Sequence, residues 1–158
     1  MSVEVHHIGL TVSDLERSVE WYCKNLGLRD IGRAHLEGAA ISEQTGLVDT
    51  DIDIALLAGE NIVIELLRYV NPIGDDYVLR MCDVGAAHPC LVVSDLEATC
   101  AAMREHGVVF HSRPARLVGE TVMVYVRDPD GIMIELIQPA SDLRLSRLLE
   151  LAGLPSTS

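Results

Sequence analysis

The sequence predicts an α+β protein made of two tandem β-α-β-β-β modules. One observation is a repeated motif: residues 7–16 read HIGLTVSDLE and residues 88–97 read HPCLVVSDLE, so that His88 follows His7 by 81 positions. A second is that each half ends in an apolar run with one embedded carboxylate, IVIELL and IMIELI. A shared offset of this kind indicates two copies of one supersecondary unit. The predicted boundaries are 1–70 for the first module, 71–84 for a connector, 85–139 for the second module, and 140–158 for a C-terminal helix and tail.

The first module opens with a predicted strand at residues 3–12. Alternation along this strand places His7 and Thr11 on one face and His6 on the other. Ser13, followed three residues later by Glu16, has the spacing of a capping box and predicts the start of a helix. The helix is expected to bury a stripe of apolar side chains and to end at Gly27. The stripe consists of Leu15, Val19, Tyr22 and Leu26.

The rest of the first module is predicted as a strand at residues 28–36 and a hairpin that turns at Gly59–Glu60. Between them, residues 37–48 fit neither the helical nor the strand period. Glu135 follows Glu65 by 70 positions rather than 81, so the second module is 11 residues shorter. The surplus falls in 37–48, which is predicted to be either a substrate loop near the mouth of a shared cavity or a passive surface loop.

The second module repeats the order of the first. A strand at residues 86–93 carries His88, Ser94 and Glu97 form another capping box, and the helix is expected to end near Gly107. The further predicted strands are 108–112, 120–127 and 131–138, the last two joined by the turn sequence DPDG at 128–131. Beyond Pro139, an apolar stripe at helical spacing predicts the C-terminal helix; it consists of Leu145, Leu148, Leu149 and Ala152.

Composition excludes several classes of function. The formal net charge is −12, and Lys24 is the single lysine against 24 carboxylates. A protein that binds nucleic acid needs clustered cations, so we expect no nucleic-acid partner. No apolar run reaches the roughly 18 to 20 residues of a membrane span, and the N-terminus lacks the pattern of a signal peptide, so we expect a cytoplasmic protein.

The four cysteines do not form a metal-binding pattern. Two of them lie in predicted helices and one in an apolar strand, and no CxxC spacing occurs among Cys23, Cys82, Cys90 and Cys100. We expect free, buried thiols in a reducing compartment rather than a zinc cluster.

Four side chains at matching points of the two modules suggest a shared site: His7 and Glu65 in the first, His88 and Glu135 in the second. A single histidine in a strand is more often an ordinary core or surface residue. A carboxylate within an apolar strand is costly to bury unless it is paired or bound to a metal. If the modules pack with pseudo-twofold symmetry, their sheets form a cupped, barrel-like metal cavity in which these four side chains converge.

Two imidazoles and two carboxylates make a mixed nitrogen and oxygen ligand set. Such a set suits one divalent metal ion, Ni, Co, Mn, Fe or Zn, and differs from structural zinc sites and calcium cages. An ion held in this way is a Lewis acid that can polarise a carbonyl and stabilise an enolate.

The double β-α-β-β-β pattern, the opening HHIGLTVSDL and the closing DPDGIMIEL resemble the vicinal oxygen chelate superfamily, over residues 4–139. This superfamily includes glyoxalase I, methylmalonyl-CoA epimerase, extradiol dioxygenases and thiol transferases for fosfomycin. The resemblance implies that His7, Glu65, His88 and Glu135 are the metal ligands. Extradiol dioxygenases and fosfomycin enzymes use two histidines and one glutamate, whereas a fourth ligand at Glu65 favours the isomerase and lyase branch.

The implied reaction is proton transfer next to a carbonyl through a metal-stabilised enolate, catalysed by an isomerase, epimerase or lyase. Glu135 is the first choice for the base, since the last-strand glutamate has this role in glyoxalase I, and Glu65 is the second. The alternatives are an iron-dependent extradiol ring-cleaving dioxygenase and a metal-free protein that binds a drug.

The substrate is expected to be a small carbonyl compound or thioester. Thr11 stands where glyoxalase I has an arginine that grips glutathione, and Tyr69 stands where an amide is expected, so both substrate-binding positions argue against glutathione. The stretch ELLRYVNP resembles CoA-ester epimerases more closely, although Glu65 replaces their usual glutamine. We expect a homodimer, and the sequence leaves open whether the cavity closes within one chain or across two.

Overall fold

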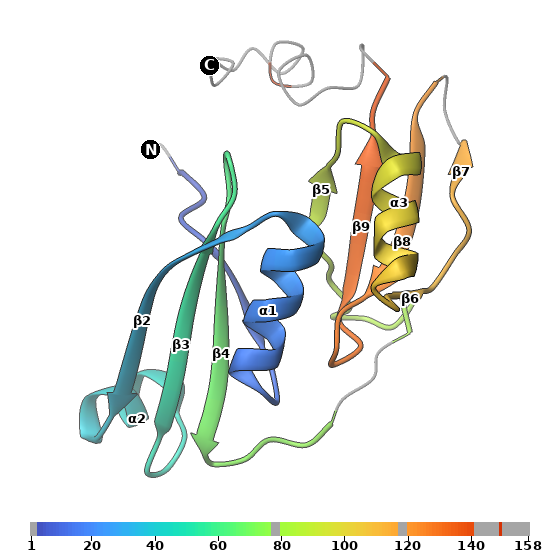
Figure 1. Ribbon diagram of the computed structural model, residues 1–158. Helices are drawn as coiled ribbons and strands as arrows, with labels where there is room; N and C mark the ends of the chain where they lie inside the picture. Colours follow the sequence, from blue (N-terminus) through green and yellow to red (C-terminus); the bar gives the residue numbers. More distant parts are fainter. Residues whose placement is uncertain (1–2, 77–79, 117–119, 141–148, 150–158) are drawn as a thin grey trace. The chain divides into compact units, whose positions relative to one another are not determined.

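The protein has an α+β fold with two β-sheets, as the sequence predicts (Figure 1). A computed structural model describes residues 3–76, 80–116, 120–140 and 149. The chain divides into two compact units, Met1–Cys82 with Asp128–Gly131 and Asp83–Arg127 with Ile132–Ser158. In the part of the chain that is described, no helix is both long and apolar enough to cross a membrane.

The first unit contains a four-stranded sheet and two helices. In chain order these are β1 (Ile8–Thr11), α1 (Leu15–Leu26), β2 (Arg29–Glu37), α2 (Ala39–Thr45), β3 (Asp51–Ala58) and β4 (Val63–Asn71). The strand order is β1-β4-β3-β2. β1 is parallel to β4, whereas β3 is antiparallel to both β2 and β4. The first and last strands of the module therefore lie side by side, although they are far apart in the sequence.

The second unit repeats this arrangement. Its elements are β5 (Cys90–Val92), α3 (Leu96–Glu105), β6 (Val109–Phe110), β7 (Ala115–Arg116), β8 (Val122–Arg127) and β9 (Met133–Gln138). The strand order is β5-β9-β8-β6, with β7 also paired to β8. β5 is parallel to β9 and β8 is antiparallel to it. The short strand β7 is an element that the sequence analysis did not predict.

Each unit buries one face of its helix against its own sheet. In the first unit α1 buries Leu15, Val19 and Tyr22, three residues of the predicted stripe, together with Ser18. In the second unit α3 buries Leu96, Cys100 and Met103. The sheets contribute fully buried aliphatic side chains to the cores; the largest are Ile52, Leu57, Ile64, Leu66, Val124, Val126, Ile134 and Leu136. Apolar burial of this kind is the main stabilising term for a domain of this size.

Both predicted N-caps are wrong by one residue. Asp14 caps α1 by accepting a hydrogen bond from the Arg17 amide, and Asp95 caps α3 by accepting one from the Ala98 amide. The hydroxyl of Ser13 is instead donated to Asp130, 117 positions away, at 2.6 Å. The predicted end of α1 is confirmed, because Gly27 adopts the left-handed conformation that closes a helix (φ 67°).

The segment 37–48, which has no counterpart in the second module, contains regular structure. Residues 39–45 form helix α2, which ends at Gly46 in the left-handed conformation and packs beside β2. A helix of seven residues is shorter than the window in which helical periodicity becomes visible, so the sequence pattern missed it. Its role as a substrate loop stays a prediction.

Three further expectations need correction or fall outside the described residues. The strands predicted at 3–12 and 86–93 are shorter, so both predicted ligand histidines lie just before their strands. The cysteines are free, as predicted, but only Cys100 is buried, while Cys82 and Cys90 are exposed and Cys23 is half-buried. Apart from Leu149, the predicted C-terminal helix lies outside the described residues.

Candidate metal centre

His7 and Glu65 form a contact within the first unit, which we name the first pair. The parallel ladder between β1 and β4 places Gly9 opposite Glu65, and His7 lies two residues before Gly9. The Nε2 atom of His7 lies 3.3 Å from Oε2 of Glu65. The Glu65 side chain is 20% exposed and that of His7 37%. A carboxylate within an apolar strand is thereby partnered, as its burial requires.

The neighbouring histidine supports His7 rather than replacing it. Nδ1 of His6 lies 2.7 Å from Nδ1 of His7, so one of these nitrogens donates to the other. The two rings also meet edge to face, with centroids 5.0 Å apart. Because Nδ1 of His7 is engaged with His6, its Nε2 is the nitrogen that faces Glu65, which is consistent with the choice of His7 as the ligand.

His88 and Glu135 form the equivalent contact within the second unit, the second pair. Cys90 lies opposite Glu135 in the parallel ladder of β5 and β9, and the Glu135 amide donates to the Pro89 carbonyl at 3.0 Å. Nε2 of His88 lies 3.0 Å from Oε2 of Glu135. The Glu135 side chain is 13% exposed, less than that of Glu65.

Two further side chains surround Glu135, and the sequence analysis missed both. Tyr125 lies opposite Glu135 in the antiparallel ladder of β8 and β9, and its hydroxyl donates to Glu135 Oε2 at 3.4 Å. Burial, and then the charge of Glu135, raise the pKa of Tyr125, so the phenol stays protonated and can donate. The same causes raise the pKa of the Cys90 thiol to about 11. A turn made of the four DPDG residues alone would place Val124 opposite Glu135. The observed register pairs Arg127 with Met133 and leaves five residues between the strands, so the sequence pattern did not reveal Tyr125.

The geometry of each pair fits two neighbouring ligands of one ion. Two donor atoms about 2.1 Å from a metal ion and at right angles to one another lie about 3.0 Å apart. The separations between nitrogen and oxygen, 3.3 Å and 3.0 Å, match this value. The structure thus brings together His7 with Glu65, and His88 with Glu135. The pairs belong to different units, so the meeting of all four side chains at one ion stays a prediction.

The two predicted substrate-binding residues lie on the same sheet face as the first pair. Thr11 is exposed and lies four residues after His7, while Tyr69 is half-buried and lies four residues after Glu65. Because side chains alternate along a strand, both point to the side of the sheet on which Glu65 lies. Their contacts with substrate stay a prediction.

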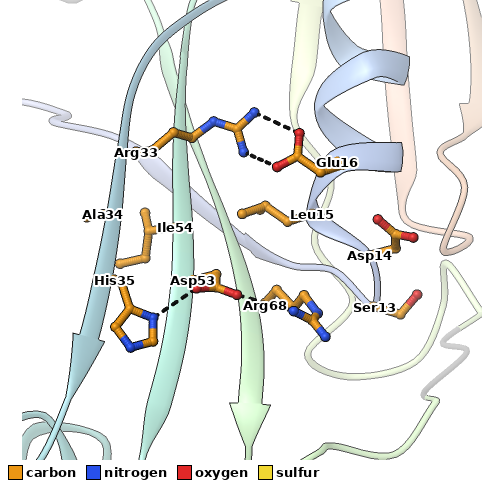
Figure 2. Close-up of a pocket in the computed structure, with 10 residues that line it drawn as sticks. All are labelled: Ser13, Asp14, Leu15, Glu16, Arg33, Ala34, His35, Asp53, Ile54 and Arg68. Atoms are coloured by element: carbon orange, nitrogen blue, oxygen red, sulfur yellow. Dashed lines mark hydrogen bonds and ion pairs between the residues drawn. The ribbon is translucent and has the colours of Figure 1, made fainter.

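A third polar cluster lies on the opposite face of the first sheet, beside a pocket of about 610 Å³ (Figure 2). His35 Nδ1 lies 2.9 Å from Asp53, and its Nε2 lies 3.6 Å from Asp51 and 3.9 Å from Glu37. Among the described residues, His35, Glu37 and Asp51 form the one group of three whose ligand atoms are close enough together to hold a metal ion. The hydrogen bond to Asp53 raises the pKa of His35, and the same bond lowers the pKa of Asp53.

This cluster is not among the site residues that the sequence predicts. Its signal is a cross-strand pattern, since the residues in HLE of β2 face those in DID of β3 through the pairs His35–Asp53 and Glu37–Asp51. These are exposed or half-buried residues on an edge strand and its neighbour, and one histidine among several carboxylates is explained by ion pairing.

Comparison with known proteins identifies the family. Residues 4–136 match the model of the Glyoxalase/Bleomycin resistance protein/Dioxygenase superfamily. The chain belongs to this superfamily, which confirms the resemblance predicted from the two motifs and supports the glyoxalase I branch.

Individual relatives refine this placement. The chain is 31% identical over 140 residues to a probable lactoylglutathione lyase from Synechocystis, covering 85% of this chain and 95% of the relative. It is 29% identical over 146 residues to a 2-epi-5-epi-valiolone epimerase from Actinomyces, covering 86% and 79%. The crystal structure of a glyoxalase family protein from Bacillus cereus matches with a TM-score of 0.79 at 22% identity, covering 87% and 95%. That last similarity shows the fold alone.

Proposed function

We propose that this protein is a metal-dependent lyase, isomerase or epimerase that moves a proton next to a carbonyl group. The observation that carries the proposal is that each unit holds an imidazole nitrogen and a carboxylate oxygen 3.0 to 3.3 Å apart, at matching positions of the repeat. The relatives named lactoylglutathione lyase and 2-epi-5-epi-valiolone epimerase support the same reaction classes.

His7, Glu65, His88 and Glu135 would together hold one divalent ion: Ni, Co, Mn, Fe or Zn. Nitrogen and carboxylate donors suit these metals, and no thiolate belongs to the set. When bound, the ion acts as a Lewis acid that polarises a carbonyl oxygen and stabilises the negative charge developing on it.

The glutamates supply the proton transfer. Glu135 is the first choice of base and Glu65 the second, as the resemblance to glyoxalase I implies. Both carboxylates are mostly shielded from water, at 13% and 20% exposure, and each is held beside an imidazole of its own unit. A positioned base of this kind contributes roughly a hundred- to ten-thousand-fold to the rate.

The substrate that we propose is a small carbonyl compound or thioester. Thr11 and Tyr69 offer hydroxyl groups on the sheet face of the first pair. Neutral hydroxyls suit hydroxyl or carbonyl oxygens of a substrate better than they suit a carboxylate, which pairs with Arg or Lys. Glutathione, with two carboxylates, is therefore a poorer match than a polyol ketone or a simple thioester.

The decisive measurement combines metal analysis with proton exchange. Purified protein should contain close to one divalent ion per chain, because each chain has one set of the four proposed ligands. The variants His7→Ala and His88→Ala should lose this ion. His35→Ala is the matched control, because His35 also faces carboxylates but lies on the opposite sheet face. Loss of the ion from His35→Ala, with retention in His7→Ala, would place the metal at the third cluster and overturn the proposal.

Exchange of solvent deuterium into candidate substrates tests the reaction. Hemithioacetals of 2-oxoaldehydes, 2-methyl thioesters and cyclic polyol ketones should be compared with and without a chelator. The metal-loaded protein should exchange the proton next to the carbonyl in one of these classes. Turnover of catechols with oxygen uptake and no such exchange would show a ring-cleaving dioxygenase instead.

We also propose a cytoplasmic homodimer, and mixing variants tests how its cavity closes. If each site combines the first unit of one chain with the second unit of its partner, His7→Ala and His88→Ala chains mixed through reversible dissociation regain activity. One site of the mixed dimer then receives both unaltered histidines. If each chain closes its own cavity, every site keeps one substitution and the mixture stays inactive.

A further inference from the structure

We propose that Tyr125 is the positioning residue of the second pair: it orients Glu135 and His88 for metal binding. This inference rests on the proposed function, since it concerns how this chain holds the ion. It goes beyond the four ligands, because Tyr125 belongs to β8, a strand that supplies no ligand.

Tyr125 touches both members of the second pair. Its hydroxyl donates to Oε2 of Glu135 at 3.4 Å, the same oxygen that faces His88 Nε2 at 3.0 Å. Its ring meets the imidazole of His88 edge to face, with centroids 5.3 Å apart and an interplanar angle of 88°. One half-buried side chain thus limits the rotation of the carboxylate and of the imidazole together.

The repeat provides an internal comparison for this role. Glu135 and Glu65 both lie on the last strand of their unit, and each has a residue directly opposite on the preceding antiparallel strand. That residue is Tyr125 for Glu135 but Leu56 for Glu65. Both are half-buried. The sheet of the first unit thus holds an aliphatic side chain at the corresponding position and pairs its strands there without a hydroxyl group.

Groups that hydrogen-bond to metal ligands determine ligand orientation, and their removal typically costs about 10- to 100-fold in metal affinity or activity. A phenol that donates to one carboxylate oxygen holds that group in place and leaves its other acceptor sites available to a cation. We therefore expect the hydroxyl of Tyr125 to contribute to metal affinity rather than to the folding of the sheet.

The test uses Co²⁺ as the probe, because it reports both affinity and coordination geometry. Metal-stripped protein is titrated with Co²⁺ in competition with a chromophoric chelator, and the visible absorption of the bound Co²⁺ is recorded. Tyr125→Phe keeps the ring and removes the hydroxyl; we expect the Kd for Co²⁺ to rise about 10- to 100-fold with a changed absorption spectrum. Tyr125→Leu, which copies Leu56 of the first unit, should weaken binding at least as much.

Tyr22→Phe is the matched control. The Tyr22 hydroxyl also donates to a carboxylate, Asp128 at 3.1 Å, but in the buried core beside α1. Tyr22→Phe should lower the thermal midpoint and leave the Co²⁺ affinity of the folded protein unchanged. Tyr125→Phe should weaken Co²⁺ binding and leave the thermal midpoint unchanged.

The two failures can be told apart. Wild-type affinity and spectrum in Tyr125→Phe would overturn the positioning role, and so would weakened binding that appears only in Tyr125→Leu. Absence of Co²⁺ binding by the unaltered protein would overturn the proposed metal site itself.

Discussion

The two histidine–glutamate pairs share a backbone arrangement but differ in what supports them. In both units the glutamate lies opposite the residue two positions after the histidine, in a parallel ladder. In the first pair the histidine has the additional partner, because His6 contacts His7. In the second pair it falls on the glutamate, because Tyr125 donates to Glu135.

This difference shows which features of a duplicated site depend on the fold and which on single side chains. The ladder aligns histidine and glutamate in each unit whatever residues lie around them. The neighbours occupy equivalent positions of the repeat but are chemically different: Ala87 corresponds to His6 by the offset of 81, and Leu56 corresponds to Tyr125. The two pairs are therefore expected to respond unequally to equivalent substitutions.

The largest expected effect separates the two glutamates. Glu135→Gln should lower the rate of solvent exchange next to the carbonyl by about 100- to 10,000-fold, because it removes the first-choice base. Glu65→Gln should lower it less, since an amide oxygen can still bind a metal ion. Exchange rates measured on the metal-loaded variants decide this, and an equal or reversed order would transfer the role of base to Glu65.

A second comparison concerns the cores of the two units. The Tyr22 side chain is fully buried and its hydroxyl donates to the buried Asp128, whereas Met103 stands at the equivalent position of α3. Tyr22→Phe should lower the free energy of unfolding by about 1–3 kcal/mol, because a buried carboxylate loses a hydrogen bond. Urea denaturation measures this change. Met103→Leu, which keeps the side-chain volume and loses no hydrogen bond, should cost less than about 1.5 kcal/mol.

The histidines of the two pairs differ in their preceding residue, which is His6 before His7 and Ala87 before His88. His6→Ala removes the ring that contacts Nδ1 of His7 and should weaken Co²⁺ binding by about 10-fold. This is the lower limit of the effect expected for a group that hydrogen-bonds to a metal ligand, because His6 is exposed. Ala87→His, at the corresponding position of the second unit, should leave the affinity unchanged or raise it. Unchanged binding in His6→Ala would show that the Glu65 contact alone orients His7.

The smallest expected effect lies in the third cluster. The pKa of His35 is raised in the folded protein, so its contribution to stability is present below its ordinary pKa of 6.5 and is lost as the pH rises through the higher folded value. The pKa of Asp53 is lowered, so its contribution is present above 3.8 and is lost as the pH falls through the folded value. His35→Gln should therefore reduce the thermal midpoint slightly between about pH 4 and 6.5. The difference should disappear in mildly alkaline buffer.

Much of the fold could be predicted from the sequence because its signals are local. The alternation in the strands, Gly27 and the DPDG turn each act within a few residues. Together with the motif repeated at an offset of 81 positions, they indicate the two modules and their element order. They also indicate that each histidine lies at the strand that begins its module, and that each glutamate lies on the strand that ends it; the structure places both histidines just before their strands. The helix α2 could not be predicted, because seven residues are too few to show a helical period in the sequence.

The sequence by itself determined the repeat, the candidate ligands and the strands that carry them, since each depends on spacing along the chain. Only the tertiary structure decided the contacts between distant residues. Ser13 does not cap α1, because Asp130 takes its hydroxyl from 117 positions away. Tyr125 faces Glu135 because two antiparallel strands place them opposite one another. Such pairings depend on register and packing rather than on the pattern of either strand, and spacing along the chain does not encode the neighbours that support each candidate ligand.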